Sequence, residues 1–309
     1  MICQQTIIEP VCISGIGLHS GERINMTLRP ADAGTGIIFH RLLNNRTVDI
    51  PARADKVVDT RLATVLGDGD VRISTVEHLL ATLSAYGIDN LHIDIDGDEV
   101  PIMDGSAAPF ASIIEESGIR KLPRSRKFIS IREPVSVIDG EKRVSIIPSR
   151  FFRITFDIAF DHPCIALQQR SVKITSESFR RELASARTFG FLKDVETLKA
   201  AGLARGGSLE NAIVIDDERI LNPEGLRYQD EFVRHKILDS IGDLSLIGAP
   251  ILGHVRAFKA GHDINLQIVE KLLANPQAWQ ILEFSEEDLE KALQIPTPTF
   301  ASEIALSKA

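Results

Sequence analysis

Each half of the chain contains apolar residues at strand-like spacing and at helical spacing, and these two patterns come in the same order in both halves. This order is the sequence feature that most constrains the fold. In the first half, apolar residues alternate with polar ones over Glu22 to Pro30 and over Leu91 to Ile95, as in strands with one buried face. Between them, apolar residues from Ser74 to Gly87 follow helical spacing. A second helix is expected over Ala107 to Ser117. The first half therefore predicts strands followed by helices.

The second half has the same order. Alternation over Ile154 to Phe160 predicts a strand, and helical spacing returns over about Asp230 to Ile247. A strand is then expected to Lys259, followed by a last major helix that begins at Asp263. These patterns predict two α+β layers, although the two halves share no visible sequence repeat.

Residues 118–127 break both periodicities and concentrate positive charge. A segment of this kind is typical of a boundary between domains. We therefore expect a first α+β domain over residues 1–125, which carries Glu77 and His78. The second α+β domain is expected over residues 126–309 and carries His235, Asp239 and His262.

Composition excludes several classes of protein. Hydrophobic residues make up 44% of the chain and charged residues 25%, as in a folded globular protein. The net charge of −8 argues against a broad nucleic-acid surface. No uncharged apolar run approaches the ~20 residues that span a bilayer. The N-terminus also lacks a basic segment followed by an apolar one, so we expect a cytoplasmic protein without a transmembrane segment.

The cysteines narrow the possible chemistry. There are three, scattered along the chain and without a Cys-x-x-Cys pair. Neither a disulfide framework nor a thiolate zinc site is indicated. The ligands of any bound metal should therefore be imidazole and carboxylate, and eight histidines supply candidates.

The strongest local signal lies in the helix predicted near residue 235. His235, Asp239 and Asp243 are spaced by four, so a helix stacks them along one face, where an imidazole and a carboxylate can share a cation. The alternative is an ordinary pair on a solvated face. However, Phe232 and Gly242 border this line, which indicates a covered face. A covered carboxylate must be paired or bound to metal.

A second signal lies at the start of the helix in the first half. Ser74 and Glu77 match a capping box, which by itself would explain the glutamate. His78 points toward Ala81 and Thr82, and a face of small residues indicates that another element packs closely against it. Taken alone, His78 is more often a satisfied core histidine than a ligand.

Together the two signals predict a catalytic metal site. Two imidazoles and one carboxylate leave a fourth zinc position for water. Glu77, next to a ligand, is placed to deprotonate that water. His262 is a candidate acid for a departing amine, and its alternative is a surface histidine that precedes an Asp263 N-cap. The predicted ligands are His78, His235 and Asp239.

Six segments then resemble the UDP-3-O-(3-hydroxyacyl)-N-acetylglucosamine deacetylase family. The similarity runs in order along nearly the whole chain. The segments are GIGLHSG (15–21), ISTVEH (73–78), PIMDGSAAPF (101–110), ARTFGF (186–191), EFVRHK (231–236) with Asp239, and KAGH (259–262).

The resemblance implies a reaction and a fold. Its members remove acetate from the 2-amide of an acylated UDP-glucosamine, the committed step of lipid A synthesis in the cytoplasm of Gram-negative bacteria. The implied fold is α+β, with two similar domains packed face to face, each a mainly antiparallel sheet with a two-helix layer. The implied cofactor is one Zn²⁺ per chain, with Fe²⁺ as an alternative in the cell. The expected partner is the acylated UDP-sugar, bound by a monomer.

The resemblance also implies roles for individual residues. His78, His235 and Asp239 would bind zinc, Glu77 would be the general base, and His262 would protonate the leaving amine. Asp243 would orient or charge-balance His262, and Lys236 and Thr188 would stabilise the oxyanion. An insert over about residues 191–214 would build an apolar passage for the acyl chain. Its predicted contacts, and those near its mouth, are Leu198, Leu203, Gly207, Leu18, Leu62 and Phe189. Those to the uridine diphosphate are Phe160, Asp161, Lys142 and Lys259.

Two residues depart from the pattern expected for the family. Arg61 stands where an apolar residue is expected, which predicts a different local wall. Asp263 follows His262 directly, and we expect its carboxylate to raise the pKa of that histidine. Two other functions stay open: a zinc amidohydrolase acting on a different amide, and a non-catalytic nucleotide-sugar binder whose metal only clamps two domains.

Overall fold

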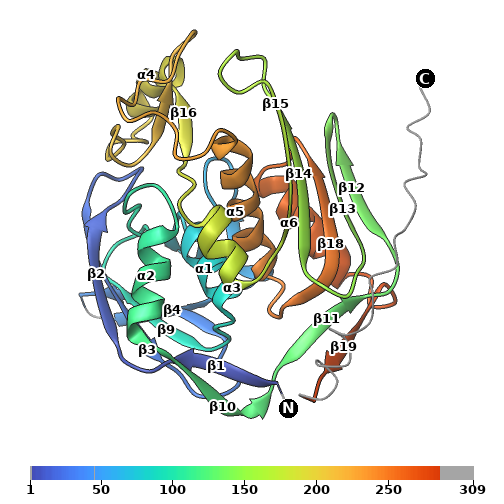
Figure 1. The fold of residues 1–309 in the computed structure, drawn as a ribbon. Coiled ribbons are helices and arrows are strands. Elements are labelled where there is room, and N and C mark those ends of the chain that lie inside the picture. The colour runs from blue at the N-terminus through green and yellow to red at the C-terminus, as the bar shows by residue number, and fades with distance from the viewer. Residues whose placement is uncertain (1, 45, 286–309) are drawn as a thin grey trace, which may run out of the picture.

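The computed structural model describes residues 2–44 and 46–285 (Figure 1). The first half is built on a five-stranded sheet in the order β2-β3-β9-β4-β5. Only the contact between β9 and β4 is parallel. The strands are β2 (Val11–Ile16), β3 (Arg23–Pro30), β4 (Ile37–Leu43), β5 (Arg46–Pro51) and β9 (Leu91–Ile95).

The second half contains a sheet with the same series of antiparallel and parallel strand pairings, in the order β12-β13-β18-β14-β15. Again only the third contact, between β18 and β14, is parallel. These strands are β12 (Val135–Asp139), β13 (Lys142–Pro148), β14 (Arg153–Ala159), β15 (Leu167–Lys173) and β18 (Ile251–Phe258). Two further strands, β11 (Lys127–Ile131) and β19 (Trp279–Glu283), extend this sheet from β18.

Both halves also place their helices alike. In each, four strands are followed by a helix, a fifth strand and a second helix. The helices are α1 (Glu77–Tyr86) and α2 (Ala108–Ser117) in the first half, and α5 (Glu231–Ser245) and α6 (His262–Leu273) in the second. The expected α+β fold of two similar, mainly antiparallel layers is confirmed, and the two halves are structural relatives without a visible sequence repeat.

Different elements are inserted between the fourth strand and the first helix of each half. The first insert holds a short 3₁₀ turn (Ala54–Lys56) and a small sheet of β6 (Val57–Asp59), β7 (Val65–Asp68) and β8 (Val71–Ile73). The second holds α3 (Ser176–Ser178), a π-helical turn (Phe179–Leu183), β16 (Phe189–Phe191), α4 (Leu192–Ala200) and β17 (Ile213–Ile215). Because β16 and β17 are parallel with α4 between them, the insert expected over about 191–214 forms a β-α-β projection, drawn at the upper left of Figure 1.

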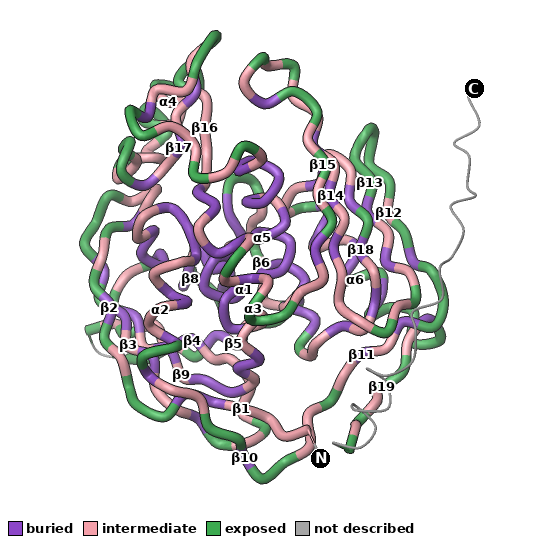
Figure 2. Tube along the Cα trace, viewed as in Figure 1, coloured by how far each residue is buried: buried purple, intermediate pink, exposed green. Residues whose placement is uncertain are grey.

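Helices α1 and α5 pack against each other at the buried centre of the molecule (Figure 2). Ala81 and Thr82, on the small-residue face of α1, have no exposed surface. A Cβ atom at Gly242 would lie only 2.1 Å from the carbonyl oxygen of Glu77, so only glycine allows this approach. This contact brings the metal-ligand candidates of the two halves to one place.

The remaining paired strands connect the halves. Strand β1 (Cys3–Ile7) pairs with β10 (Ile119–Ser125), and β11 begins two residues later at Lys127. The domain division at residues 125 and 126 falls between β10 and β11 and stays a prediction, and the last part of the second domain, residues 286–309, lies outside the described residues. Among the residues that the structure describes, no helix combines the length and apolar composition needed to cross a bilayer.

Candidate metal centre and active site

Three predicted ligands from the two halves converge. His78 lies in the first turn of α1, and His235 and Asp239 lie one turn apart on α5. The Oδ1 atom of Asp239 is 3.6 Å from Nε2 of His78 and 3.2 Å from Nε2 of His235. One ligand atom from each residue lies within 4.8 Å of the others, and all three residues are buried. This donor set matches a zinc site with an open position.

Hydrogen-bond acceptors that face each other between these side chains indicate a cation. Nδ1 of His235 lies 3.0 Å from the Ala186 carbonyl oxygen, which only accepts, so Nδ1 carries the ring proton. Burial lowers the pKa of His235 to about 3, so the ring is neutral and its Nε2 atom carries a lone pair. Oδ1 of Asp239 has no hydrogen-bond partner within the described part of the chain. Two acceptors therefore face each other in a buried site, and a bound metal ion would satisfy both.

Glu77 faces the same site because the alternative capping box does not form. Helix α1 begins at Glu77, and no side chain caps its N-terminus. Ser74 instead donates to the Asp98 carbonyl, while Oε2 of Glu77 accepts from the Thr64 amide at 3.1 Å. Burial raises the pKa of Glu77, and the nearby His262 and His78 pull it the other way. A buried carboxylate beside a metal ligand has the position of a general base.

His262 lies on the other side of Glu77 as the first residue of α6. Its Nδ1 is 2.9 Å from Oδ2 of Asp243, and its Nε2 is 4.0 Å from Oε1 of Glu77. Burial disfavours the charged ring, but the attraction and hydrogen bond of Asp243, with Glu77, outweigh it and raise the pKa of His262 to about 9. His262 is therefore protonated at neutral pH. The Asp263 N-cap, on which the alternative interpretation of His262 depended, does not form, since no side chain caps α6.

Asp243, and not Asp263, is the neighbouring aspartate that raises the pKa of His262. The Asp263 carboxylate is exposed and accepts from Gln267 at 2.8 Å, whereas Asp243 touches His262 directly. The reason is geometric, because a residue that follows the first position of a helix points about 100° away from it. The sequence-based expectation for Asp263 was therefore wrong.

Two residues that the sequence analysis missed hold Asp243 in place. Thr64 donates its hydroxyl to Oδ1 of Asp243 at 2.5 Å, and Asn265 donates to Oδ2 at 2.9 Å. Asn265 had a detectable signal, since it is a polar residue three positions after His262 on the apolar side of a helix. Thr64 had none, because it lies 179 residues from Asp243 in sequence.

Comparison with known protein families shows which family of proteins carries this site. The family model of UDP-3-O-acyl N-acetylglycosamine deacetylases matches residues 4–274. The chain belongs to this family. The deacetylase of Syntrophotalea carbinolica is 63% identical over 93% of this chain and 93% of its own length. That of Geobacter sp. strain M21 is 53% identical over 96% and 98%. That of Myxococcus xanthus is 53% identical over 93% and 91%. The chain is therefore a deacetylase, a hydrolase, of a metalloenzyme family.

A small cavity of this deacetylase opens onto the converging side chains. Ten of the predicted residues line it: Glu77, His78, His235, Asp239, Lys236, His262, Thr188, Leu18, Leu62 and Phe189. Nζ of Lys236 donates to Oδ2 of Asp239 at 2.8 Å. Burial disfavours the ammonium, but Asp239 outweighs it and raises the pKa of Lys236, so the lysine stays charged. A cation here suits a developing oxyanion.

His19 also lines this cavity and was not among the predicted site residues. Neither of its ring nitrogens has a hydrogen-bond partner among the described residues, and burial lowers the pKa of the ring. The buried Glu99 holds its loop, because the carboxylate accepts from the amides of His19 and Ser20 at 2.9 Å each. Glu99 also accepts from Thr75, which has a φ of 58° just before α1. The GIGLHSG segment was the available signal for this loop.

Arg61 does not alter the cavity wall as expected. Its side chain is 87% exposed and forms an ion pair with Asp59 at 2.6 Å. Leu62 and Ala63, the next residues, line the cavity instead. The expectation of a different wall at Arg61 was therefore wrong, since the guanidinium points to solvent.

The four residues predicted for the uridine diphosphate lie outside the cavity lining, at one edge of the second sheet. Phe160 and Asp161 follow β14, Lys142 begins β13, and Lys259 follows β18, the strand between them. The Phe160 ring packs against the ring of Phe189 with centroids 5.8 Å apart, which connects this edge to the cavity. Nζ of Lys259 donates to Glu141 at 2.8 Å.

The second insert meets the His19 loop through its backbone. The amides of Arg205 and Gly206 donate to the carbonyls of His19 at 3.2 Å and Leu18 at 3.0 Å. A Cβ atom at Gly207 would lie 3.6 Å from Cδ1 of Leu18, so this part of the insert borders the cavity mouth. Leu198 on α4 and Leu203 beyond it are partly exposed, and neither lines the cavity.

Proposed function

We propose that the chain hydrolyses the 2-acetamido group of UDP-3-O-acyl-N-acetylglucosamine and releases acetate, with Zn²⁺ held by His78, His235 and Asp239. The observation that carries the metal assignment is the pair of buried acceptors, His235 Nε2 and Asp239 Oδ1, which face each other at 3.2 Å. When bound, such an ion lowers the pKa of a coordinated water and polarises the amide carbonyl. In the cell Fe²⁺ is an alternative occupant of the same donor set.

Glu77 and His262 each carry out one of the two proton transfers that the reaction needs. Glu77 takes the proton of the attacking water, because its carboxylate is buried beside His78 and bound by only one backbone amide. His262 gives a proton to the departing amine from Nε2, the ring nitrogen that faces Glu77, while Asp243 holds Nδ1. An amine leaves the tetrahedral intermediate only when it is protonated. Lys236 and Thr188, which also line the cavity, stabilise the oxyanion.

In this proposal the substrate extends from the edge of the second sheet, through the cavity, to the second insert. The pyrophosphate and uridine contact the sheet edge that carries Lys142, Phe160, Asp161 and Lys259, where positive side chains suit phosphates. The acyl chain passes Leu18 and runs along the second insert past Leu198, Leu203 and Gly207. We further propose that the protein acts as a cytoplasmic monomer in the committed step of lipid A synthesis.

Metal content and acetate release measured together test this function. For His78→Ala we expect loss of zinc and of turnover. For Glu77→Ala we expect zinc to be retained while turnover falls by about 10²- to 10⁴-fold. Full turnover in Glu77→Ala would remove the general-base assignment.

Substrate variants separate the two alternative functions. A zinc amidohydrolase with another substrate would hydrolyse simple acetylated amides that lack the uridine group and the acyl chain. A nucleotide-sugar binder with a clamping metal would bind zinc and substrate but release no acetate. We expect turnover that depends on both the uridine group and the acyl chain.

A further inference from the structure

The segment 184–188 connects the proposed metal centre to a buried ion pair. Its Ala186 carbonyl accepts from Nδ1 of His235 at 3.0 Å, and its Thr188 lines the cavity. It belongs to no regular element apart from its approach to β16, so backbone hydrogen bonds of a helix or sheet do not hold it. Other backbone hydrogen bonds hold its two ends, since the amide of Ala107 donates to the Ala184 carbonyl and the amide of Thr188 donates to the Gly105 carbonyl. The peptide unit that carries the Ala186 carbonyl instead gives its N–H, that of Arg187, to a side chain, the carboxylate of Glu231.

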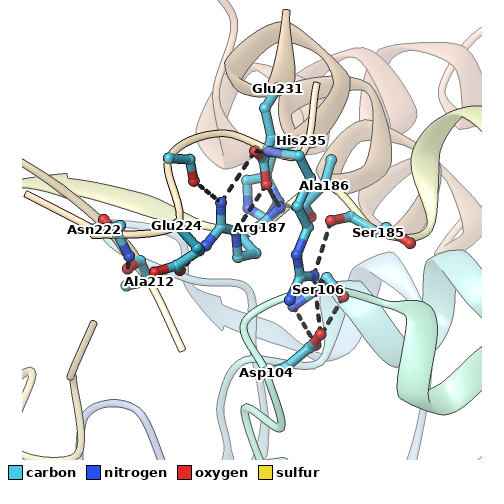
Figure 3. Close-up of polar contacts among 12 residues, drawn as sticks. Asp104, Ser106, Ser185, Ala186, Arg187, Ala212, Asn222, Glu224, Glu231 and His235 are labelled. Carbon is cyan, nitrogen blue, oxygen red and sulfur yellow. Dashed lines mark hydrogen bonds and ion pairs between the residues drawn. The ribbon is translucent and has the colours of Figure 1, made fainter. Parts of the chain in front are cut away.

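Arg187 lies between these two residues, and its side chain extends toward Glu224 and Glu231 (Figure 3). Its side chain is only 1% exposed, and all three nitrogens of its guanidinium donate hydrogen bonds. Nε donates to Oε1 of Glu231 at 3.0 Å, Nη1 donates to Glu224 at 2.6 Å, and Nη2 donates to the Gly225 carbonyl at 2.7 Å. Because the guanidinium is planar and each of its nitrogens is bound in a buried place, the side chain is held in one orientation.

Glu231, the first residue of α5, is the centre of this network and has no exposed surface. Its Oε1 also accepts from the backbone amide of Arg187 at 3.0 Å, and its Oε2 accepts from the amide of Arg227 at 2.5 Å. The glutamate therefore binds both the side chain and the main chain of Arg187. Neither contact involves a residue of the cavity.

The geometry closes a ring of contacts. Glu231 and His235 are one turn apart on α5, so they share a face of the helix. Glu231 holds Arg187, the neighbouring Ala186 carbonyl holds Nδ1 of His235, and α5 connects His235 back to Glu231. Such a ring fixes the carbonyl relative to the imidazole.

Residues of the first half of the molecule also hold segment 184–188 in place. Nη1 of Arg227 donates to Asp104 at 2.9 Å and to the Ser185 carbonyl at 3.0 Å. The amide of Thr188 donates to the Gly105 carbonyl at 2.8 Å. Both halves of the molecule therefore constrain segment 184–188.

We propose that Arg187 and Glu231 are a pair of positioning residues for metal binding. They hold the Ala186 carbonyl against Nδ1 of His235, which keeps the proton on Nδ1 and directs the Nε2 lone pair at the metal. The proposal rests on the metal site of the proposed function. A group that hydrogen-bonds directly to a metal ligand, as the Ala186 carbonyl does to His235, changes metal affinity by about 10- to 100-fold when the contact is lost.

Metal affinity of a matched pair of variants tests the proposal in the full-length chain. Arg187→Lys keeps the charge but cannot make the separate Nε, Nη1 and Nη2 contacts. Arg170→Lys is the control, because Arg170 forms ion pairs with Glu182 and Asp230 near α5 but touches neither segment 184–188 nor His235. Titration with Zn²⁺ against a competing chelator should show affinity about 10- to 100-fold weaker for Arg187→Lys and near wild type for Arg170→Lys.

The imidazole itself provides a readout that a purely structural role would not change. In ¹⁵N-histidine NMR spectra of the wild-type chain, we expect His235 to carry its proton on Nδ1 both with and without zinc. In Arg187→Lys we expect faster exchange of that proton with solvent. An Nε2-protonated His235 in the metal-free wild type would overturn the proposal, and this measurement does not require any variant to fold.

The outcomes separate this proposal from the proposed function. Wild-type chain that binds no Zn²⁺ would contradict the metal site itself. Wild-type chain that binds Zn²⁺ and releases acetate, together with an Arg187→Lys variant that loses thermal stability but keeps its Zn²⁺ affinity, would overturn only the positioning role. Should Arg187→Lys not fold, Glu231→Gln replaces it, with the same loss of affinity expected, because an amide cannot accept from both backbone amides as the carboxylate does.

Discussion

The two inserts occupy the same place in two copies of one topology, but they contact the site in opposite ways. The first insert packs inside the molecule: Leu66 and Ile73 have no exposed surface. From it, Thr64 reaches both Glu77 and Asp243 through short polar contacts. In the second insert, helix α4 has no buried residue, and the contacts to the His19 loop are made by backbone amides.

Under the proposed function, this difference would separate the chemistry from substrate selection within one scaffold. Groups that transfer protons need fixed positions and shifted pKa values, which burial and directional hydrogen bonds provide. A passage for a flexible acyl chain needs apolar surface but little directional bonding. We therefore expect substitutions in the first insert and its partners to change turnover or stability, and substitutions in the projection around α4 of the second insert to change KM.

The largest effect should follow from Asp243→Asn. Without this carboxylate the pKa of His262 falls from about 9, so the alkaline limb of the kcat profile should move to lower pH by about one unit or more. Turnover above that limb should fall by about 10²-fold or more, because the leaving amine loses its acid. A pH profile of acetate release measures both changes. Asp263→Asn is the control, and an equal shift in that variant would contradict the assignment to Asp243.

The raised pKa of His262 also predicts how stability depends on pH. Because the folded state holds this proton more tightly than the unfolded state, whose histidine has a pKa of 6.5, the contribution is fully present below pH 6.5. It is lost as the pH rises through about 9. Urea unfolding of metal-free wild type and Asp243→Asn across this range should show a smaller loss in the variant. Parallel curves for the two proteins would argue against the ion pair.

An intermediate effect is expected for Thr64→Val in the first insert. Valine keeps the shape of threonine but leaves one oxygen of the buried Asp243 without its donor. The free energy of unfolding should fall by about 1–3 kcal/mol, as measured by urea denaturation. Thr60→Val, at a more exposed position before the site, should change it by less than about 0.5 kcal/mol. Equal losses in the two variants would mean that the buried contact has no special importance.

The smallest effect is expected for Leu203→Ala in the second insert. Leu203 is partly exposed, so its removal should raise KM for a long-chain substrate by about fivefold and leave kcat and thermal stability nearly unchanged. A substrate with a short acyl chain should show the same KM for variant and wild type. A fall in kcat instead would remove the distinction between the two inserts.

Periodicity predicted much of the fold because burial of one face leaves a local pattern. Strands β3, β9 and β14 and helix α5 were expected near their observed bounds for this reason. Periodicity alone could not give the shared topology of the halves, since strand order and direction depend on pairing between segments distant in sequence; the family resemblance supplied the expectation of two similar domains. The second insert was placed by family resemblance, and its β-α-β form appears only in the structure.

Errors and omissions at the site have the same physical origin. The capping box of Ser74 and Glu77 was plausible from local spacing, but the amide of Thr64 competes for the carboxylate. Asp263 was the nearest acid to His262 in sequence, yet Asp243 is its partner in space. Local reasoning cannot find a contact whose partner comes from another part of the chain.

The sequence by itself determined which residues could share a helical face, because His235 and Asp239 are four apart and any α-helix stacks them. It also determined that ligands would be imidazole and carboxylate, since cysteine pairs are missing from the sequence. Only the tertiary structure decided that His78 meets them, through the close approach of α1 and α5 at Gly242. It also decided the protonation of the site, because burial and the charges of distant residues set each pKa.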